Sequence, residues 1–240
     1  MSAQDFRVLL VGCGQLGSRH LQAVASLESV HEIEVVDSRP EAFQLGRERL
    51  AEVMDRQPQM EIRWLPSLEE ATTGGDLCIV ATQAPGRCQL VREVVERLGY
   101  TVFLLEKIVS QSVGELEELM AFSTVHRLSI CVNLKGRAYP FHQRVKHLLD
   151  PAEPMVFSVV GGNHGLATNG IHMADLFAFY DGSRRIELTG SHIDPILHHT
   201  KRGMLDLSGS LQGYTDKGSC FTLSYAADHT ASDQLSISTR

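Results

Sequence analysis

The chain has 240 residues, of which 43% are hydrophobic and 21% are charged, and its formal net charge at pH 7 is −7. This length accommodates one or two domains with a sizeable core, and the composition is that of a globular protein rather than a disordered or fibrous one. The negative charge argues against broad electrostatic binding to nucleic acid or to an anionic membrane. Because the sequence shows neither a membrane-spanning apolar stretch nor a signal peptide, we expect a cytoplasmic protein.

Short apolar runs alternate with helix-like segments in the first half of the chain. Strands are predicted at residues 7–11, 32–36, 62–65, 77–81, 101–105 and 128–132. Helices are predicted at residues 18–27, 40–54, 85–98 and 112–125, with a brief helix starting at Ser67. Ser67 and Ser112 each precede a glutamate by three residues, the spacing of a capping box. The alternation predicts a doubly wound α/β domain with a parallel sheet and helices on both faces.

The second half has a different pattern. One apolar helix is predicted at residues 170–180, and alternating strand-like segments follow at 186–193, 205–212, 219–225 and 234–238. This indicates an α+β domain in which a mostly antiparallel meander packs on one helix. The proline-containing stretch 150–154 suggests a boundary, and the helix at 139–149 fits either side of it. We place the two domains at 1–133 and 134–240.

A GxGxxG turn follows the first predicted strand and opens the first helix. Gly12 permits the tight turn, Gly14 lets the backbone approach a pyrophosphate, and Gly17 lets the helix pack against the strand. Asp37 ends the next strand 20 positions after Gly17, where a carboxylate accepts hydrogen bonds from an adenosine ribose. The alternatives are a methyl-donor site and a turn that binds nothing; the third glycine and Asp37 favour a dinucleotide, so we predict a Rossmann-type cofactor domain.

The choice between NAD and NADP depends on two residues of opposite charge. Asp37 disfavours the 2′-phosphate of NADP by repulsion, whereas Arg39, two residues later, attracts one. We therefore expect NAD, with NADP possible. The expected cofactor-binding residues are Gly12, Gly14, Gln15, Leu16, Gly17, Asp37, Ser38, Arg39, Thr82, Gln83 and Glu106.

Charged residues follow the predicted fifth strand. Glu106 and Lys107 come directly after residues 101–105, at the carboxyl edge where open parallel sheets bind ligands. A lysine there hydrogen-bonds a substrate hydroxyl and stabilises negative charge on it as hydride leaves. The alternative is a salt bridge at the strand end, and position alone does not separate the two interpretations.

Several elements together resemble one enzyme family. The segments VGCGQLGSRHL, IVATQAP, VFLLEK, VNLKGRAYP and NGIHMADLFAFYDG occur in this order and are similar to the glucose-fructose oxidoreductase and inositol dehydrogenase family (Gfo/Idh/MocA), especially members acting on sugars or nucleotide sugars. The resemblance covers nearly the whole chain. It implies a Rossmann domain, an α+β domain whose open sheet mediates oligomerisation, and NAD or NADP as cofactor.

The same resemblance assigns catalytic candidates. The Glu-Lys-Pro motif of the family corresponds to Glu106, Lys107 and Ile108, and its helix pattern Asp-x-Gly-x-His-x-x-Asp corresponds to Thr168, Gly170, His172 and Asp175. Lys107 is thereby expected to position the substrate, and His172 to accept its proton.

Two positions and the length depart from the family. Isoleucine at 108 argues against a cis peptide bond there, since a non-proline cis bond costs about 2.5–4 kcal/mol. Thr168 removes a carboxylate one turn before His172. The stretch before the His172 helix is short, and the chain ends after only the first strands expected of the family's sheet, as in a truncated chain or a trimmed natural variant.

The remaining polar residues have two interpretations each. Asn133, Lys135, Arg137, Asn169 and Asp175 line a substrate pocket in one, and are ordinary surface or helix residues in the other. His172 and Asp175 lack an evident third metal ligand, and the group His192, Asp194, His198 and His199 matches no metal-binding spacing, so no metal site is predicted. The five scattered cysteines lack CxxC spacing, which predicts buried free thiols.

Two functional hypotheses follow. The first is an NAD(P)-dependent oxidoreductase that transfers hydride between nicotinamide and a secondary alcohol or ketone of a sugar-like substrate. The second is a dinucleotide- or sugar-nucleotide-binding module that has lost catalysis and serves as a sensor or assembly partner. Alternation along residues 186–238 places Leu205, Leu207, Phe221 and Leu223 on one sheet face, and because one helix covers only one side, we expect a homodimer or larger closed assembly.

Overall fold

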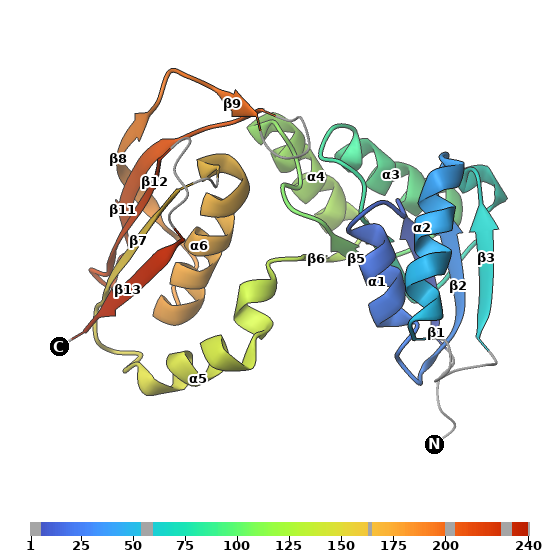
Figure 1. Cartoon of the computed structure of the whole chain (residues 1–240), viewed down its shortest axis with the longest axis horizontal. Helices are drawn as coiled ribbons and strands as arrows, with labels where there is room; N and C mark the ends of the chain where they lie inside the picture. The colour runs from blue at the N-terminus through green and yellow to red at the C-terminus, as the bar shows by residue number, and fades with distance from the viewer. Residues whose placement is uncertain (1–5, 54–59, 163–164, 200–204, 227–231, 240) are drawn as a thin grey trace. The chain divides into compact units, whose positions relative to one another are not determined.

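A computed structural model describes residues 6–53, 60–162, 165–199, 205–226 and 232–239 (Figure 1). The chain divides into two compact units, Met1–Asn133 and Leu134–Arg240. Within the described ranges, no helix is both long enough and apolar enough to cross a membrane.

The first unit is built on a six-stranded parallel sheet. Its strands lie in the order β3-β2-β1-β4-β5-β6, which is the order of a Rossmann-type doubly wound fold and confirms the predicted architecture. The strands are β1 (Phe6–Val11), β2 (Val30–Val36), β3 (Glu61–Leu65), β4 (Leu77–Val80), β5 (Val102–Leu105) and β6 (Ser129–Val132). The helices are α1 (Gly17–Val24), α2 (Pro40–Ala51), α3 (Arg87–Leu98) and α4 (Val113–Val125), with the short 3-10 helix η2 (Leu68–Glu70).

Strand β1 shows how the sheet buries both of its faces. Val8 and Leu10 belong to one apolar cluster, and Leu9 and Val11 belong to another. Since neighbouring side chains of a strand point to opposite faces, a central strand covered on both sides must be apolar throughout. The continuous run of β1 therefore places it at the centre of the sheet, where its carboxyl end positions the glycine turn.

The two predicted capping boxes have different outcomes. The Ser112 hydroxyl accepts a hydrogen bond from the Glu115 N–H at 3.3 Å and begins α4, as predicted. At Ser67 the brief helix forms as η2, as predicted, but the capping box was wrong, because the Ser67 side chain makes no capping hydrogen bond. In the tight 3-10 turn of η2, the Glu70 N–H donates to the Ser67 carbonyl oxygen instead, so the donor that a hydroxyl would cap is already bonded.

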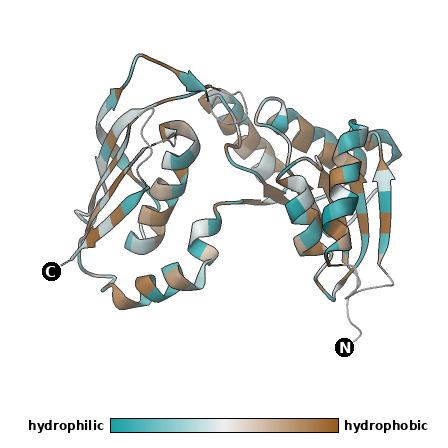
Figure 2. Cartoon of the chain, in the orientation of Figure 1, coloured by the Kyte–Doolittle hydropathy of each residue, from teal (hydrophilic) through white to brown (hydrophobic). Residues whose placement is uncertain are grey.

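The second unit contains a five-stranded mixed sheet in the order β13-β7-β12-β11-β8. Its strands are β7 (Val156–Gly162), β8 (Glu187–Ile193), β11 (Gly209–Tyr214), β12 (Cys220–Ala226) and β13 (Gln234–Ser238), and β9 (His198–His199) pairs with β10 (Leu205–Asp206). The helical elements are η3 (Lys135–Ala138), α5 (Pro140–Leu148) and α6 (Leu166–Asp181). Figure 2 shows both hydrophobic and hydrophilic residues along α5. The mostly antiparallel α+β architecture is confirmed.

The simple meander was wrong in two respects. Strand β7, which the alternating pattern did not identify, inserts between β13 and β12 and runs parallel to β12. The single strand predicted at residues 205–212 is broken into β10 and β11. Two local features accompany the break. The Asp206 carboxylate accepts a hydrogen bond from the backbone of α6. Gly209 has a φ of 129°, and a side chain at this position would clash with the His192 carbonyl.

Helix α6 covers one face of this sheet. Phe177 packs with Phe157 and Phe221, with ring centroids 5.6 and 5.1 Å apart. Val156 and Val160 alternate with the buried residues of β7 and are 56% and 55% exposed. Of the residues expected on one sheet face, Phe221 and Leu223 are buried in the cluster that contains Phe177 of α6. Leu205 is exposed because β10 lies outside the five-stranded sheet.

All five cysteines are free, as predicted. The prediction that these thiols are buried is confirmed for Cys13, Cys78 and Cys88 and was wrong for Cys131 and Cys220, which are exposed. Burial raises the pKa of the Cys13 thiol to about 11, so this thiol beside the glycine turn stays protonated and unreactive at neutral pH.

Gly17 is a position where this fold has no room for a side chain. A Cβ there would lie 1.8 Å from the Gly12 carbonyl oxygen. We expect Gly17→Ala to lower the free energy of unfolding by more than about 2 kcal/mol, because backbone must move. Gly114→Ala is the control: its Cβ meets only the Ser112 hydroxyl, at 3.6 Å, so α4 should gain up to about 1 kcal/mol. Urea unfolding measures both, and equal midpoints would contradict the close packing.

Candidate functional site

The glycine turn after β1 presents the start of α1 to an anion. Gly12 has a φ of 90°, and its N–H donates to the Val36 carbonyl at 2.8 Å. Leu16, at the N-cap of α1, makes no side-chain capping hydrogen bond, and the first turn of α1 has no acidic residue. The N–H groups of Ser18 and Arg19 donate to the Gly14 and Leu16 carbonyls, and the positive end of the helix dipole favours a phosphate at such a terminus.

Asp37 joins the end of β2 to this turn. Its carboxylate is buried and accepts a hydrogen bond from the Cys13 N–H at 2.8 Å. The Arg39 guanidinium also binds it, with Nε 3.1 Å from Oδ1 and Nη2 3.0 Å from Oδ2. Burial acts to raise the pKa of Asp37, but the hydrogen bonds from Arg39 and Cys13 outweigh it and hold the pKa below its usual value. Asp37 is therefore a carboxylate at neutral pH.

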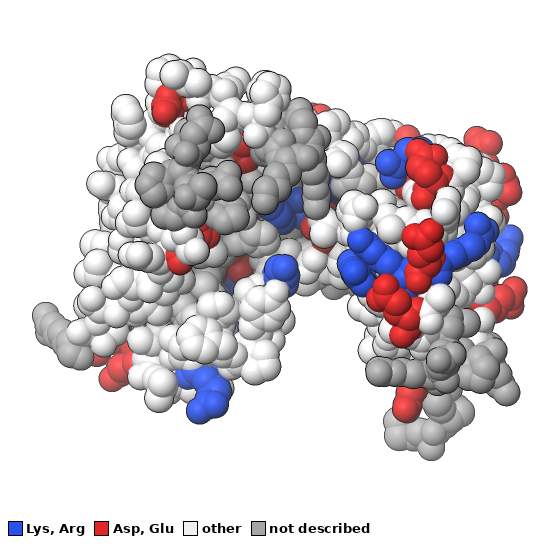
Figure 3. Space-filling model, viewed as in Figure 1, with Lys and Arg blue, Asp and Glu red and all other residues white. Residues whose placement is uncertain are grey.

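Gln15 and Leu16, which were predicted to bind the cofactor, are exposed in the glycine turn. Arg49 of α2 donates to the Gln15 backbone carbonyl at 2.5 Å and to the Ser18 hydroxyl at 2.6 Å, which ties the turn to α2. Ser38 is exposed. Over the face that carries α1 and α2, basic and acidic side chains are intermingled (Figure 3). In this unit, Arg19 of α1 pairs with Glu52 at 3.4 Å. This face is therefore not uniformly basic.

Arg87, which sequence reasoning missed, organises the ends of β4 and β5. It is 2% exposed, and its guanidinium donates to the backbone carbonyls of Thr82, Glu106 and Ile108. Gln83 is exposed beside it. A cation at the first position of α3 opposes the helix dipole, and this was the available signal that Arg87 has another role.

The Lys107–Ile108 peptide bond is cis, so the expectation of a trans bond at this position was wrong. The reason lies in a tertiary contact: Arg87 bonds the carbonyls on both sides of this peptide, and local sequence does not show that contact. Lys107 follows the buried Glu106 and is half-buried.

Glu106 is the centre of a buried polar group. One oxygen, Oε1, lies 2.7 Å from His20 Nε2 and accepts from the Asn133 side-chain amide at 2.7 Å. Burial acts to raise the pKa of Glu106, but the bonds from His20 and Asn133 outweigh it and lower the pKa. The structure thus brings Glu106 and Asn133 together and adds His20 from α1, which the sequence analysis quoted but did not assign.

In the second unit, α6 carries the remaining candidates. Half-buried His172 lies one turn after Thr168, whose hydroxyl donates to the buried carboxylate of Asp206. Asp206 also accepts from the Ala167 N–H at 3.1 Å. A carboxylate therefore reaches position 168 from another element, although the helix itself lacks one there. No sequence signal marked Asp206.

Asp175 and Arg137 form a pair. Arg137 Nε lies 2.9 Å from Asp175 Oδ2, and Nη2 donates to Oδ1, a bidentate arrangement. Half-buried Asn169 lies on the same helix, and Lys135 of η3 lies 6.0 Å from the Tyr139 ring. In the part of the chain that the structure describes, no three His, Cys, Asp or Glu residues gather as a metal site.

Solved structures share this architecture. No protein-family model and no curated protein matches the chain. GenD2 from gentamicin A biosynthesis, in complex with NAD, matches with a TM-score of 0.76 and 17% identity, over 98% of this chain and 69% of its own. The WlbA dehydrogenase from Bordetella pertussis, in complex with NADH and UDP-GlcNAcA, matches with a TM-score of 0.77 and 16% identity, over 99% and 76%.

A third match is scyllo-inositol dehydrogenase from Lactobacillus casei, with a TM-score of 0.73 and 14% identity, over 100% of this chain and 74% of its own. The chain has the fold of these dehydrogenases. The likeness extends over both units and agrees at the level of the fold with the resemblance found in the sequence.

Glu106 should make stability depend on acid pH. Because its native pKa is below the ordinary 4.5, its contribution is complete above that value and is lost as pH falls through the lower native pKa. We expect Glu106→Gln to cost about 1–3 kcal/mol at pH 7 and less at pH 4 and below, measured by urea unfolding. Glu118→Gln, at an exposed glutamate, is the control. A cost for Glu106→Gln that is constant with pH would contradict the lowered pKa of Glu106.

Proposed function

We propose that the protein is an NAD(P)-dependent oxidoreductase that transfers a hydride between nicotinamide C4 and a secondary alcohol or ketone of a sugar or nucleotide-sugar-like substrate. One observation carries the proposal: the buried Asp37 carboxylate is bonded to the backbone of the glycine turn that precedes α1. In the proposal, the turn holds the phosphates of a dinucleotide and Asp37 lies beside its ribose.

The structural neighbours support the chemistry. They include proteins described with NAD, and with NADH and UDP-GlcNAcA. For this chain, NAD is the expected cofactor, and a bound nicotinamide would supply hydride transfer. Residues of the turn would hold its phosphates, and Asp37 its ribose. A cytoplasmic location also belongs to the proposal.

Lys107 and His172 have the chemistry that the reaction requires. In the proposal, the Lys107 ammonium hydrogen-bonds the substrate oxygen and stabilises negative charge on it, and His172 takes or returns the hydroxyl proton. Asn133, Lys135 and Asn169 would contact the substrate. Arg137 and Asp175 would act as one neutral pair, since their side chains are bonded to each other.

Substitution of Lys107 and His172 tests these roles. We expect Lys107→Ala and His172→Ala each to lower turnover about 10²–10⁴-fold, with NAD affinity changed only a few-fold. Nicotinamide absorbance with NAD and NADP over a panel of sugars and nucleotide sugars is the assay. His147→Ala, at an exposed histidine of α5, should leave turnover unchanged. Dinucleotide binding without turnover across the panel would instead favour the non-catalytic module.

Assembly through the open sheet face belongs to the same proposal. We expect a homodimer or larger closed assembly, because Val156 and Val160 are exposed on the sheet face opposite α6. Val160→Lys should shift the wild-type assembly toward monomer in light scattering at micromolar concentration. Val113→Lys, at a valine of α4 that is 73% exposed, should not. A wild-type monomer would contradict this part of the proposal.

A further inference from the structure

Arg87 is a buried cation at the edge where the parallel strands of the first unit end. It is the first residue of α3, and 2% of it is exposed. Burial lowers the pKa of its guanidinium, and the negative charge of Glu106 opposes that effect. An arginine remains charged at neutral pH even so. Burial of this charge is unfavourable unless hydrogen bonds compensate for it, so the partners of Arg87 show what the charge is used for.

The hydrogen bonds of Arg87 connect the segments that follow two neighbouring strands. Nη2 donates to the Thr82 carbonyl oxygen after β4, and Nη1 donates to the carbonyl oxygens of Glu106 and Ile108 after β5. Strands β4 and β5 are paired in the sheet, so the guanidinium bridges two adjacent strand ends. Because a guanidinium is planar and its N–H groups have set directions, the three carbonyls are held in one arrangement.

Lys107 lies between the two carbonyls that share Nη1. The residues before and after it are thus bonded to the same nitrogen, which restricts the backbone from which the lysine side chain extends. The Glu106 side chain is a second anchor, because its Oε1 lies 2.7 Å from His20 Nε2 and 2.7 Å from the Asn133 amide nitrogen. The residue before Lys107 is therefore held through both its main chain and its side chain.

We propose that Arg87 is the positioning residue for Lys107, and that it acts by holding the backbone on both sides of this lysine against the end of β4. This rests on the proposed function, in which the Lys107 ammonium bonds the substrate oxygen. Arg87 acts only through Lys107, since its buried donors are directed at main-chain oxygens. A misplacement of about 1 Å in a reacting group costs about 100-fold in rate, so the position of this backbone affects turnover directly.

Two substitutions separate the charge of Arg87 from its geometry. Arg87→Lys keeps the buried charge, but an ammonium is a compact group on a flexible stem and does not present separate nitrogens to the two strand ends. Arg87→Met keeps much of the apolar volume and removes all three hydrogen bonds. If Arg87→Met does not fold in urea unfolding, Arg87→Lys, which retains the charge beside Glu106, is the variant to measure.

The position of Lys107 can be measured without any substrate. Lys107 is the only lysine among residues 1–133, and the whole chain has five. Reductive methylation with ¹³C-formaldehyde labels these amines, and Lys107→Arg identifies the Lys107 signal in a ¹³C NMR spectrum. We expect a distinct Lys107 signal in the wild type, and we expect both Arg87 substitutions to move it toward the chemical shift of exposed lysines.

Turnover gives the second measurement. On a panel substrate that the wild type converts, both Arg87 substitutions should lower kcat about 10–100-fold and change KM only a few-fold. In the Lys107→Ala background, the same substitutions should lower kcat no further, because the group that they misplace is absent. A general loss of structure would instead lower turnover in both backgrounds.

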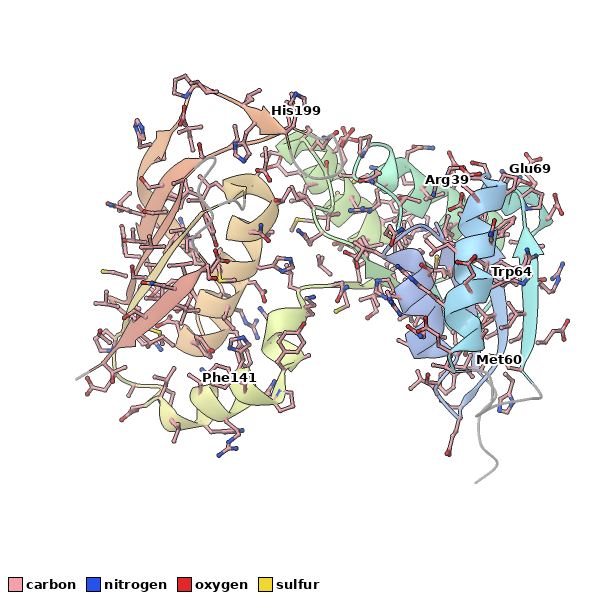
Figure 4. All side chains as sticks on the ribbon, viewed as in Figure 1. Arg39, Met60, Trp64, Glu69, Phe141 and His199 are labelled. Carbon is pink, nitrogen blue, oxygen red and sulfur yellow. The ribbon has the colours of Figure 1, made fainter. Side chains whose placement is uncertain are left out.

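Arg97→Met is the matched control. Arg97 lies on the same helix, is 49% exposed and pairs at 3.5 Å with Glu69, which Figure 4 labels at the outer edge of the first unit. Its loss changes the net charge equally but should alter neither the Lys107 signal nor turnover.

Two results would overturn the inference: a Lys107 signal that the Arg87 substitutions leave unmoved, or an equal further loss of kcat in the Lys107→Ala background. If the folded wild type converts no substrate of the panel, the proposed function fails, and the Lys107 signal alone decides whether Arg87 positions this lysine.

Discussion

The hydrogen bond from the Cys13 N–H to the Asp37 carboxylate is the interaction on which the arrangement of the glycine turn depends. It joins the turn after β1 to the end of β2, and the proposed function requires these two points to be adjacent. The bond can form because Gly12 turns the chain with a φ of 90° and Gly17 packs against the Gly12 carbonyl. The backbone geometry of these two glycines therefore positions the Cys13 N–H to bond the Asp37 carboxylate.

Two buried charged residues, Arg87 and Glu106, fix the segments that follow β4 and β5. Arg87 bonds three backbone carbonyls, and Glu106 bonds His20 and Asn133. Buried ions are costly unless they are bonded in this way, so each charge holds a defined backbone or side chain in place. Lys107 lies in the chain between Glu106 and Ile108, whose backbone carbonyls Arg87 bonds.

Position 168 shows how tertiary structure changes the meaning of a substitution. Threonine in place of an acidic residue reads as the loss of a carboxylate near His172. Asp206, 38 positions later in the chain, supplies a carboxylate to the Thr168 hydroxyl. The same carboxylate accepts a hydrogen bond from the backbone at the start of α6. Asp206 also ends β10, where the predicted strand is interrupted.

The sequence by itself determined the doubly wound first unit, because continuous apolar runs, a glycine turn and a capping serine are local signals with local causes. It also identified Asp37 by its spacing from that turn. Only the tertiary structure decided the insertion of β7 beside β12 and the contacts of Arg87 and Asp206. Each of these joins groups whose pairing follows from the packing of elements, and no periodicity or spacing in the chain encodes such a contact.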